Sequence, residues 1–283
     1  MSQRSSYQYA VFLDKVFPMI LTYKILQIKL KKEQNSKTNT QGGFTLIELM
    51  ISMALGLVLL LVIGTVFVSS RQTFREQEDN ARIQEGGRFA LEILGRSIKQ
   101  AGHVEVPFND FKVSFEGTAI TGTNGAAGIA DTLTVQYDGA LGDQDCEGAS
   151  VDVVGEIIQN HFNLDTANAE LQCSGVISAT PAPPGAPPSG SVLLSNVEDL
   201  QIRYGIDTNG DQSVDQYIAA PADWDQVISA RVCVLVRSEK TNIVSAGNYL
   251  DCDGVSVAIP ADRRLRRAFS ATFNLRNRIN FLP

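Results

Sequence analysis

The sequence contains one long, unbroken apolar segment. Residues 44–68 read FTLIELMISMALGLVLLLVIGTVFV, in which Glu48 is the single ionisable side chain. As an α-helix this segment would be about 37 Å long, which exceeds the ~30 Å hydrocarbon core of a bilayer. Water-soluble domains rarely contain such a run, so the pattern predicts a membrane-spanning helix.

The helical pattern continues beyond the apolar segment, through residues 69–102. No proline lies between residues 44 and 106, and apolar side chains recur at helical spacing among Arg, Glu and Gln. These apolar positions are Phe74, Ile83, Phe89, Ala90, Ile93, Leu94 and Ala101. We expect one helix that ends near Gly102. We also expect a kink or short break at Gly86 and Gly87, because a helical glycine costs about 1 kcal/mol relative to alanine.

Residues 103–283 form the predicted head domain, which is rich in β-strand patterns. Apolar residues alternate at Leu133, Val135 and Tyr137, at Leu200, Ile202 and Tyr204, at Val232, Val234 and Val236, and at Phe269, Ala271, Phe273 and Leu275. Polar residues intervene at 132, 134, 136 and at 270, 272, 274, so we expect a sheet with one face in water. The segment TPAPPGAPPS at 180–189 is typical of a polyproline-like linker. An antiparallel sheet packed on one long helix gives the fold class α+β.

The distribution of charge gives the expected membrane orientation. The formal net charge is −7, yet residues 1–43 hold seven basic and two acidic side chains. A basic segment before the span indicates a cytoplasmic N-terminus and an exported, periplasmic head. The acidic body argues against a nucleic-acid binder, so no nucleic-acid partner is expected.

Glu48 is the unusual residue of the apolar segment. A carboxylate at membrane depth costs about 2.5–3.5 kcal/mol even on lenient insertion scales, so a plain membrane anchor does not explain it. An ordinary cleaved signal peptide is also disfavoured, because the apolar run is too long and no small-x-small site follows. Cleavage just before Phe44 would create an α-amino group able to pair with Glu48, in the same chain or in a neighbouring copy.

The segment GGFTLIE at 42–48 resembles the class III signal of type IV pilins and pseudopilins. The resemblance implies that a prepilin peptidase cuts after Gly43 and methylates the new N-terminal Phe44. It also implies that Glu48 pairs with an N-terminal amine during filament assembly. Residues 80–102, with QEGGRFA and IKQAG, resemble the PilW family of minor pilins, to which the J-type pseudopilins of type II secretion are close relatives.

The resemblance implies a domain organisation and a set of partners. Residues 1–43 would be a cleaved leader, 44–68 the transmembrane and filament-core half of the helix, 69–102 its amphipathic half, and 103–283 the head. Expected partners are the prepilin peptidase, the inner-membrane assembly platform, other minor pilins, the major pilin and a large tip adhesin. The chain would start in the inner membrane and move to the pilus or cell surface, acting in the initiation of pilus assembly.

Two other functions stay open. A J-type pseudopilin would share this architecture but serve protein secretion, and a membrane-tethered periplasmic binding domain would carry the cleavage motif by chance. Enzymatic activity is not expected, because the sequence has no Gly-x-Ser-x-Gly elbow, no phosphate-binding glycine loop and no His-x-x-x-His pair.

Four cysteines lie in the head, at Cys146, Cys173, Cys233 and Cys252. In an oxidising periplasm an even number favours two disulfides, for which three connectivities are open. The local pairs Cys146–Cys173 and Cys233–Cys252 are favoured, and would contribute about 3 kcal/mol each. Buried free thiols are the alternative, above all for Cys233. Zinc is not expected, because CxxC pairs are absent and the histidines are isolated.

One acidic loop is a candidate calcium site. The oxygen-bearing side chains of Asp207, Asn209, Asp211, Ser213 and Asp215 alternate as the ligands of a calcium loop do. Gln212 replaces the usual glycine at the sixth position and Ile218 the usual glutamate at the twelfth. The alternative is a turn rich in Asp, Asn and Gly between two strands.

A cluster of arginines at 263–267 (RRLRR), followed by Arg276 and Arg278, is the remaining charged motif. A phosphate or DNA site would use such residues, but the acidic head argues against it. We expect instead the solvated start of a strand or a contact with an acidic subunit.

Overall fold

The computed structural model describes residues 43–105, 115, 117–125, 129–181 and 190–277. The expected leader up to residue 42, most of the proline-rich segment 180–189 and Arg278 lie outside the described residues. The chain divides into two compact units, Met1–Thr65 and Val66–Pro283. Helix α2 (Leu46–Gln100) begins in the first unit and ends in the second.

The N-terminal half of α2 has no packing partner within the described chain. Its apolar side chains are exposed, with Leu57, Leu60 and Ile63 between 62% and 70% accessible. Among the described residues, α2 is the helix that is long and apolar enough to cross a membrane. This agrees with the membrane span expected from residues 44–68.

The C-terminal half of α2 belongs to the head and buries one face there. Ile83, Ala90, Leu94 and Ile98 are each at most 2% exposed and lie on that face. The helix ends at Gln100, close to the expected Gly102, which adopts a left-handed φ of 69°. The side-chain amide of Asn277 donates to the carbonyls of the last helical turn, at 3.1 Å from that of Lys99.

Of the kink or short break expected at Gly86 and Gly87, the break is wrong, because α2 is continuous through both residues. A Cβ atom on Gly87 would lie 2.3 Å from the ring of Phe269. One on Gly95 would lie 2.3 Å from the ring of Phe273. Because glycine has no side chain, the two aromatic rings pack directly against the helix backbone at these positions. The packing gained there outweighs the roughly 1 kcal/mol of helix propensity lost at each glycine.

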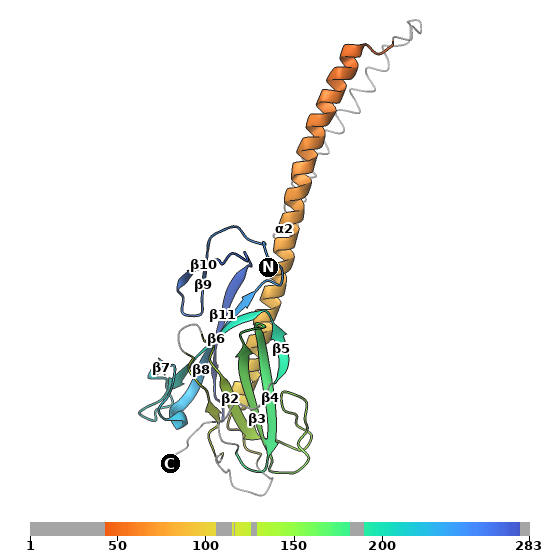
Figure 1. The fold of residues 1–283 in the computed structure, drawn as a ribbon. Coiled ribbons are helices and arrows are strands. Elements are labelled where there is room, and N and C mark those ends of the chain that lie inside the picture. The colour runs from red at the N-terminus through yellow and green to blue at the C-terminus, as the bar shows by residue number, and fades with distance from the viewer. Residues whose placement is uncertain (1–42, 106–114, 116, 126–128, 182–189, 278–283) are drawn as a thin grey trace, which may run out of the picture. The chain divides into compact units, whose positions relative to one another are not determined.

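The head contains two main antiparallel sheets and a small hairpin (Figure 1). The first sheet has the order β1-β2-β3-β4-β5, with bounds Ile120–Thr121, Leu133–Asp138, Ile157–Asp165, Glu170–Ser178 and Ser191–Ser195. The second has the order β11-β8-β6-β7, with bounds Arg266–Asn274, Val227–Arg237, Val197–Ile206 and Gln216–Ile218. Strands β9 (Asn248–Leu250) and β10 (Ser256–Ala258) form the hairpin, and a 3-10 turn, η1, spans Trp224–Gln226.

These elements share one hydrophobic core. Buried residues of α2 pack with those of β2 and β3 from the first sheet and of β6 and β8 from the second. The aromatic residues Phe269 and Phe273 of β11 close it from the side of the helix. The expected α+β fold, with a long helix on antiparallel sheets, is therefore confirmed.

The expectation of a wet sheet face holds for one strand and fails for another. Ser270, Thr272 and Asn274 of β11 are exposed, as predicted. Thr134 and Gln136 of β2 are only 4% and 2% exposed, so that prediction is wrong. Strand β2 lies inside a five-stranded sheet and is covered on both faces, so Thr134 pairs with the His161 ring at 2.8 Å. Burial lowers the pKa of His161, which favours the neutral ring in this pair.

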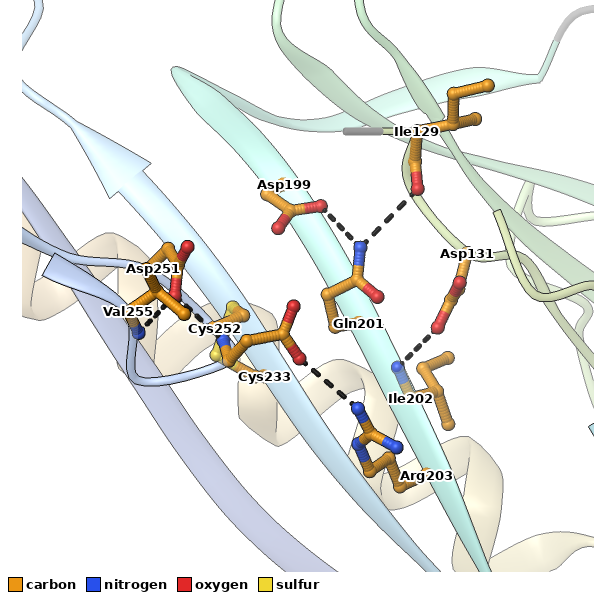
Figure 2. The surroundings of a disulfide bond; sticks show 11 residues. Ile129, Asp131, Asp199, Gln201, Ile202, Arg203, Cys233, Asp251, Cys252 and Val255 are labelled. Carbon is orange, nitrogen blue, oxygen red and sulfur yellow. Dashed lines mark hydrogen bonds and ion pairs between the residues drawn. A yellow bond between two sulfur atoms is a disulfide. The ribbon is translucent and has the colours of Figure 1, made fainter. Parts of the chain in front are cut away.

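Both favoured disulfides are present, so Cys233 is not a free thiol. Cys146–Cys173 joins the loop after β2 to β4 across 27 residues. Cys233–Cys252 joins β8 to the turn of the β9–β10 hairpin across 19 residues, as Figure 2 shows. Each bond attaches a segment of little regular structure to a strand of a main sheet.

The two adjacent glycines of α2 provide a matched test of the helix–β11 contact. We expect Gly87→Ala to lower the unfolding free energy by about 1–3 kcal/mol, because its Cβ has no room beside Phe269. Gly86→Ala should leave stability unchanged or raise it, since its Cβ would lie 3.7 Å from Leu194. Thermal unfolding followed by the fluorescence of Trp224 measures both. Equal melting temperatures for the two variants would contradict this account.

Each disulfide should stabilise the head separately. We expect the pair Cys233→Ser with Cys252→Ser to lower the unfolding free energy by about 3 kcal/mol, by the entropy of the closed loop. The pair Cys146→Ser with Cys173→Ser should cost about as much, since loop length enters only logarithmically. Peptide mapping without reductant, with thermal unfolding of both variants, checks pairing and magnitude. Recovery of a peptide linking Cys146 to Cys233 would refute the connectivity.

Candidate functional site

The predicted cleavage point lies immediately before the start of the helix. Gly43 and Phe44 are exposed and non-helical, and α2 starts at Leu46. Thr45 caps the helix, because its hydroxyl oxygen accepts the backbone N–H of Glu48 at 3.3 Å. Thr45 and Glu48 have the spacing of a capping box, which is a signal readable from the sequence alone. Cutting after Gly43 would leave Phe44 and an intact cap at the new N-terminus.

Glu48 occupies the first turn of α2, where a negative charge interacts favourably with the helix dipole. Its carboxylate lies 3.5 Å from the hydroxyl of Thr45. Within the described part of the chain no cation pairs with Glu48. The side chain is exposed, as are the flanking Ile47 and Leu49, at 65% and 49%. The described fold therefore leaves this carboxylate accessible to a cation from outside it.

The head presents one polar groove of about 630 Å³, between β6, the β9–β10 hairpin and residues 124–125. Its charged lining consists of Glu198, Asp199, Arg203, Asp251, Asp253 and Arg266. Arg203 pairs with Asp253 at 3.2 Å across it, and Gln201 donates to Asp199 at 3.0 Å (Figure 2). Burial raises the pKa of Asp199, with help from the nearby charges of Asp131 and Asp253. Such a groove suits a polar partner more than an apolar one.

A buried carboxylate, that of Asp131, holds Gly125 of the groove lining in place. Asp131 is 2% exposed and accepts the backbone N–H groups of Ile202 at 2.6 Å and Gly125 at 2.8 Å. It thereby ties the loop before β2 to strand β6. Burial raises the pKa of Asp131, and the two backbone hydrogen bonds oppose that rise. Nothing in the sequence pattern distinguished Asp131 from the many other aspartates of the head.

The arginine cluster is largely part of the internal structure of the head. The side chain of Arg266 is 4% exposed and pairs with Glu198 at 2.6 Å and Asp262 at 2.7 Å. Although burial opposes it, these hydrogen bonds raise the pKa of Arg266 and lower that of Asp262. Arg264 donates to the carbonyls of Ser238 and Glu239.

These contacts correct the expectation of a solvated strand start. The best-placed arginines hold β11 to β6 and β8, and are not available to bind phosphate. Arg263, Arg267 and Arg276 are exposed. The local sequence does not distinguish the paired Arg266 from the exposed arginines, because its partner Glu198 lies 68 residues away along the chain.

The acidic loop lies between β6 and β7, and its carboxylates face the loop itself. Asp207 accepts the backbone N–H groups of Gly210 at 2.7 Å and Gln212 at 2.8 Å. Hydrogen bonds from Ser213 lower the pKa of Asp211, and those from Thr208 lower the pKa of Asp215. Gln212 adopts a φ of 63°, where calcium loops usually have glycine. In the described residues no three acidic, His or Cys side chains are grouped for a metal, and calcium binding stays a prediction.

Comparisons with known proteins match both ends of this architecture. A family model described as Type IV Pilus-assembly protein W (PilW) matches residues 162–277. A prokaryotic N-terminal methylation motif matches residues 38–64, which include Gly43, Phe44 and Glu48. Comparison with curated proteins finds no match.

Among solved structures, the chain is similar to a type IV-like pilin from Thermus thermophilus. The two are 14% identical with a TM-score of 0.46, over 69% of this chain and 96% of that one. The PilW match spans β3 to the turn after β11, and the methylation motif covers the start of α2. The chain thus combines a prepilin-type N-terminus and a long apolar helix with a head that matches the PilW family model, and it is similar to the PilW-type proteins of type IV pili.

Proposed function

We propose that this chain is a minor pilin that helps to initiate type IV pilus assembly. It is made as an inner-membrane precursor with its N-terminus in the cytoplasm and its head in the periplasm. Prepilin peptidase cuts after Gly43 and methylates Phe44. The mature chain then enters a filament, at or near its tip. The methylation motif over residues 38–64, followed by the PilW match in the same chain, is the observation that carries the proposal.

Assembly follows from the exposed half of α2. Its apolar side chains need an apolar environment, which either lipid tails or the helices of other pilins supply. Moving between the two environments changes the apolar burial little. The electrostatic free energy of Glu48 changes more. An isolated carboxylate is costly in an apolar medium, and in the filament a docked N-terminal amine neutralises it. Glu48 therefore selects the register in which one pilin helix docks beside the next.

The head provides the specificity of a minor pilin for its partners. Its polar groove offers charged groups of both signs, and exposed Arg263, Arg267 and Arg276 offer further cations. Other minor pilins and a tip adhesin are the partners that fit this proposal. The PilW match favours pilus assembly over the secretion role of a J-type pseudopilin. A non-processed tether is the remaining alternative, and the mature N-terminus distinguishes it.

The mature N-terminus tests the proposed processing step. We expect mass spectrometry of the mature protein from cell envelopes to find N-methylated Phe44 as the N-terminal residue. In cells without prepilin peptidase the peptide across Gly43 and Phe44 should remain intact, which is the control. An intact leader in cells with active peptidase would refute the proposal and favour the tether.

Two substitutions of Glu48 separate its role in capping the helix from its role in charge pairing. Glu48→Gln keeps a capping-box side chain but removes the charge, whereas Glu48→Ala removes both. We expect both variants to be cleaved normally and both to fail to restore pili in a deletion strain. Pili counted by electron microscopy, with the wild-type gene as the control, measure this. Full restoration by Glu48→Gln would show that capping, not charge pairing, is what assembly requires.

A further inference from the structure

Three cations from distant parts of the sequence meet at the membrane-side end of the head. Arg71 and Arg75 lie one turn apart on α2, and Lys240 lies in the segment between β8 and β9. Two grooves flank them, of about 540 Å³ and 450 Å³. Both grooves are lined by Phe67, Arg71, Arg75 and Lys240. The fold thus brings Lys240 to the same grooves as Arg71 and Arg75 of the helix.

The two arginines are free to bind an anion. Both are exposed, and within the described residues neither forms an ion pair. The guanidinium of Arg71 lies 4.5 Å from the ring centroid of Phe67, which leaves its edge available for hydrogen bonds.

Glu76 and Glu78 also line the two grooves, and each has a partner on the helix. Glu78 pairs with Arg82 at 3.0 Å and only distantly with Lys240, at 3.8 Å. Glu239 also pairs with Arg82, at 3.1 Å. Glu76 accepts a hydrogen bond from Gln72 at 3.4 Å. The groups left without a close counter-charge are therefore the cations nearest the apolar segment.

Along the helix, Arg71 lies at the depth of the headgroup layer of a bilayer and Arg75 lies just beyond that layer. Arg71 is the third residue after Val68 and Arg75 the seventh. At 1.5 Å per residue they lie about 4.5 Å and about 10.5 Å beyond the apolar segment. The headgroup region extends roughly 5–8 Å beyond the hydrocarbon core on each side. No acidic side chain lies between Val68 and Arg75; the first is Glu76, which also lines the larger groove.

We propose that Arg71, Arg75 and Lys240 bind the phosphate of an anionic phospholipid in the leaflet next to the head. The arginines supply forked donors, Lys240 supplies a compact charge, and exposed Phe67 and Phe74 flank the site with apolar surface. A phosphatidylglycerol headgroup keeps its full negative charge, whereas phosphatidylcholine cancels it with its own cation. The lipid would hold the head at the membrane before the chain is extracted. This proposal rests on the helix spanning a membrane and not on its assembly into a filament.

Native mass spectrometry of the full mature chain, released from detergent with equal amounts of phosphatidylglycerol and phosphatidylcholine, tests the proposal. We expect phosphatidylglycerol to be retained at least fivefold more often. The triple variant Arg71→Gln, Arg75→Gln, Lys240→Gln should lower that retention about tenfold. Arg88→Gln, an exposed arginine further along the same helix, should not change it. Unchanged melting followed by Trp224 shows that the variants are folded.

Lys240→Gln alone decides whether the head is part of the site. We expect it to lower retention of phosphatidylglycerol severalfold. No change would overturn the site and leave only the ordinary cationic flank of a membrane span. Equal retention of the two lipids, or full retention in the triple variant, would also overturn it. If the triple variant keeps the lipid but no longer co-purifies with other pilins, the cations bind an acidic protein instead and the lipid proposal fails.

Discussion

The head depends on the close contact between the glycines of α2 and the aromatic rings of β11. Phe269 and Phe273 lie where side chains at Gly87 and Gly95 would otherwise stand. The contact brings the last strand against the helix and closes the core between the two sheets. Asn277, just beyond β11, then caps the carbonyls of the final helical turn. Helix and head are thereby joined at several points over the length of one strand.

Polar interactions fix the remaining geometry of the head. Arg266 bridges Glu198 and Asp262 in a nearly buried position, which ties the start of β11 to β6 across the intervening strand β8. The Cys233–Cys252 bond holds the β9–β10 hairpin to β8, and the polar groove lies between that hairpin and β6. These contacts fix the arrangement of the charged side chains around the groove.

Much of this protein could be predicted from local sequence. The apolar run at 44–68 and the basic segment before it predict a membrane helix, because insertion depends on hydrophobicity and flanking charge. The GGFTLIE segment indicates the cleavage site, and alternation places strands β2, β6, β8 and β11. Local cysteine pairs agree with the disulfides, since both loops close between neighbouring elements. These features depend on residues close to one another along the chain.

The tertiary structure decided what depends on residues far apart. From the local sequence Gly87 is expected to break the helix, but the ring of Phe269 packs on it in the fold. Thr134 is expected to face solvent, but both faces of β2 are covered. Arg266 differs from its neighbours only because Glu198 reaches it, and Lys240 joins Arg71 only through the fold. Alternation determines which residues share a face of a strand. Whether that face meets water, a ring or a charge depends on packing partners whose position the local pattern does not encode.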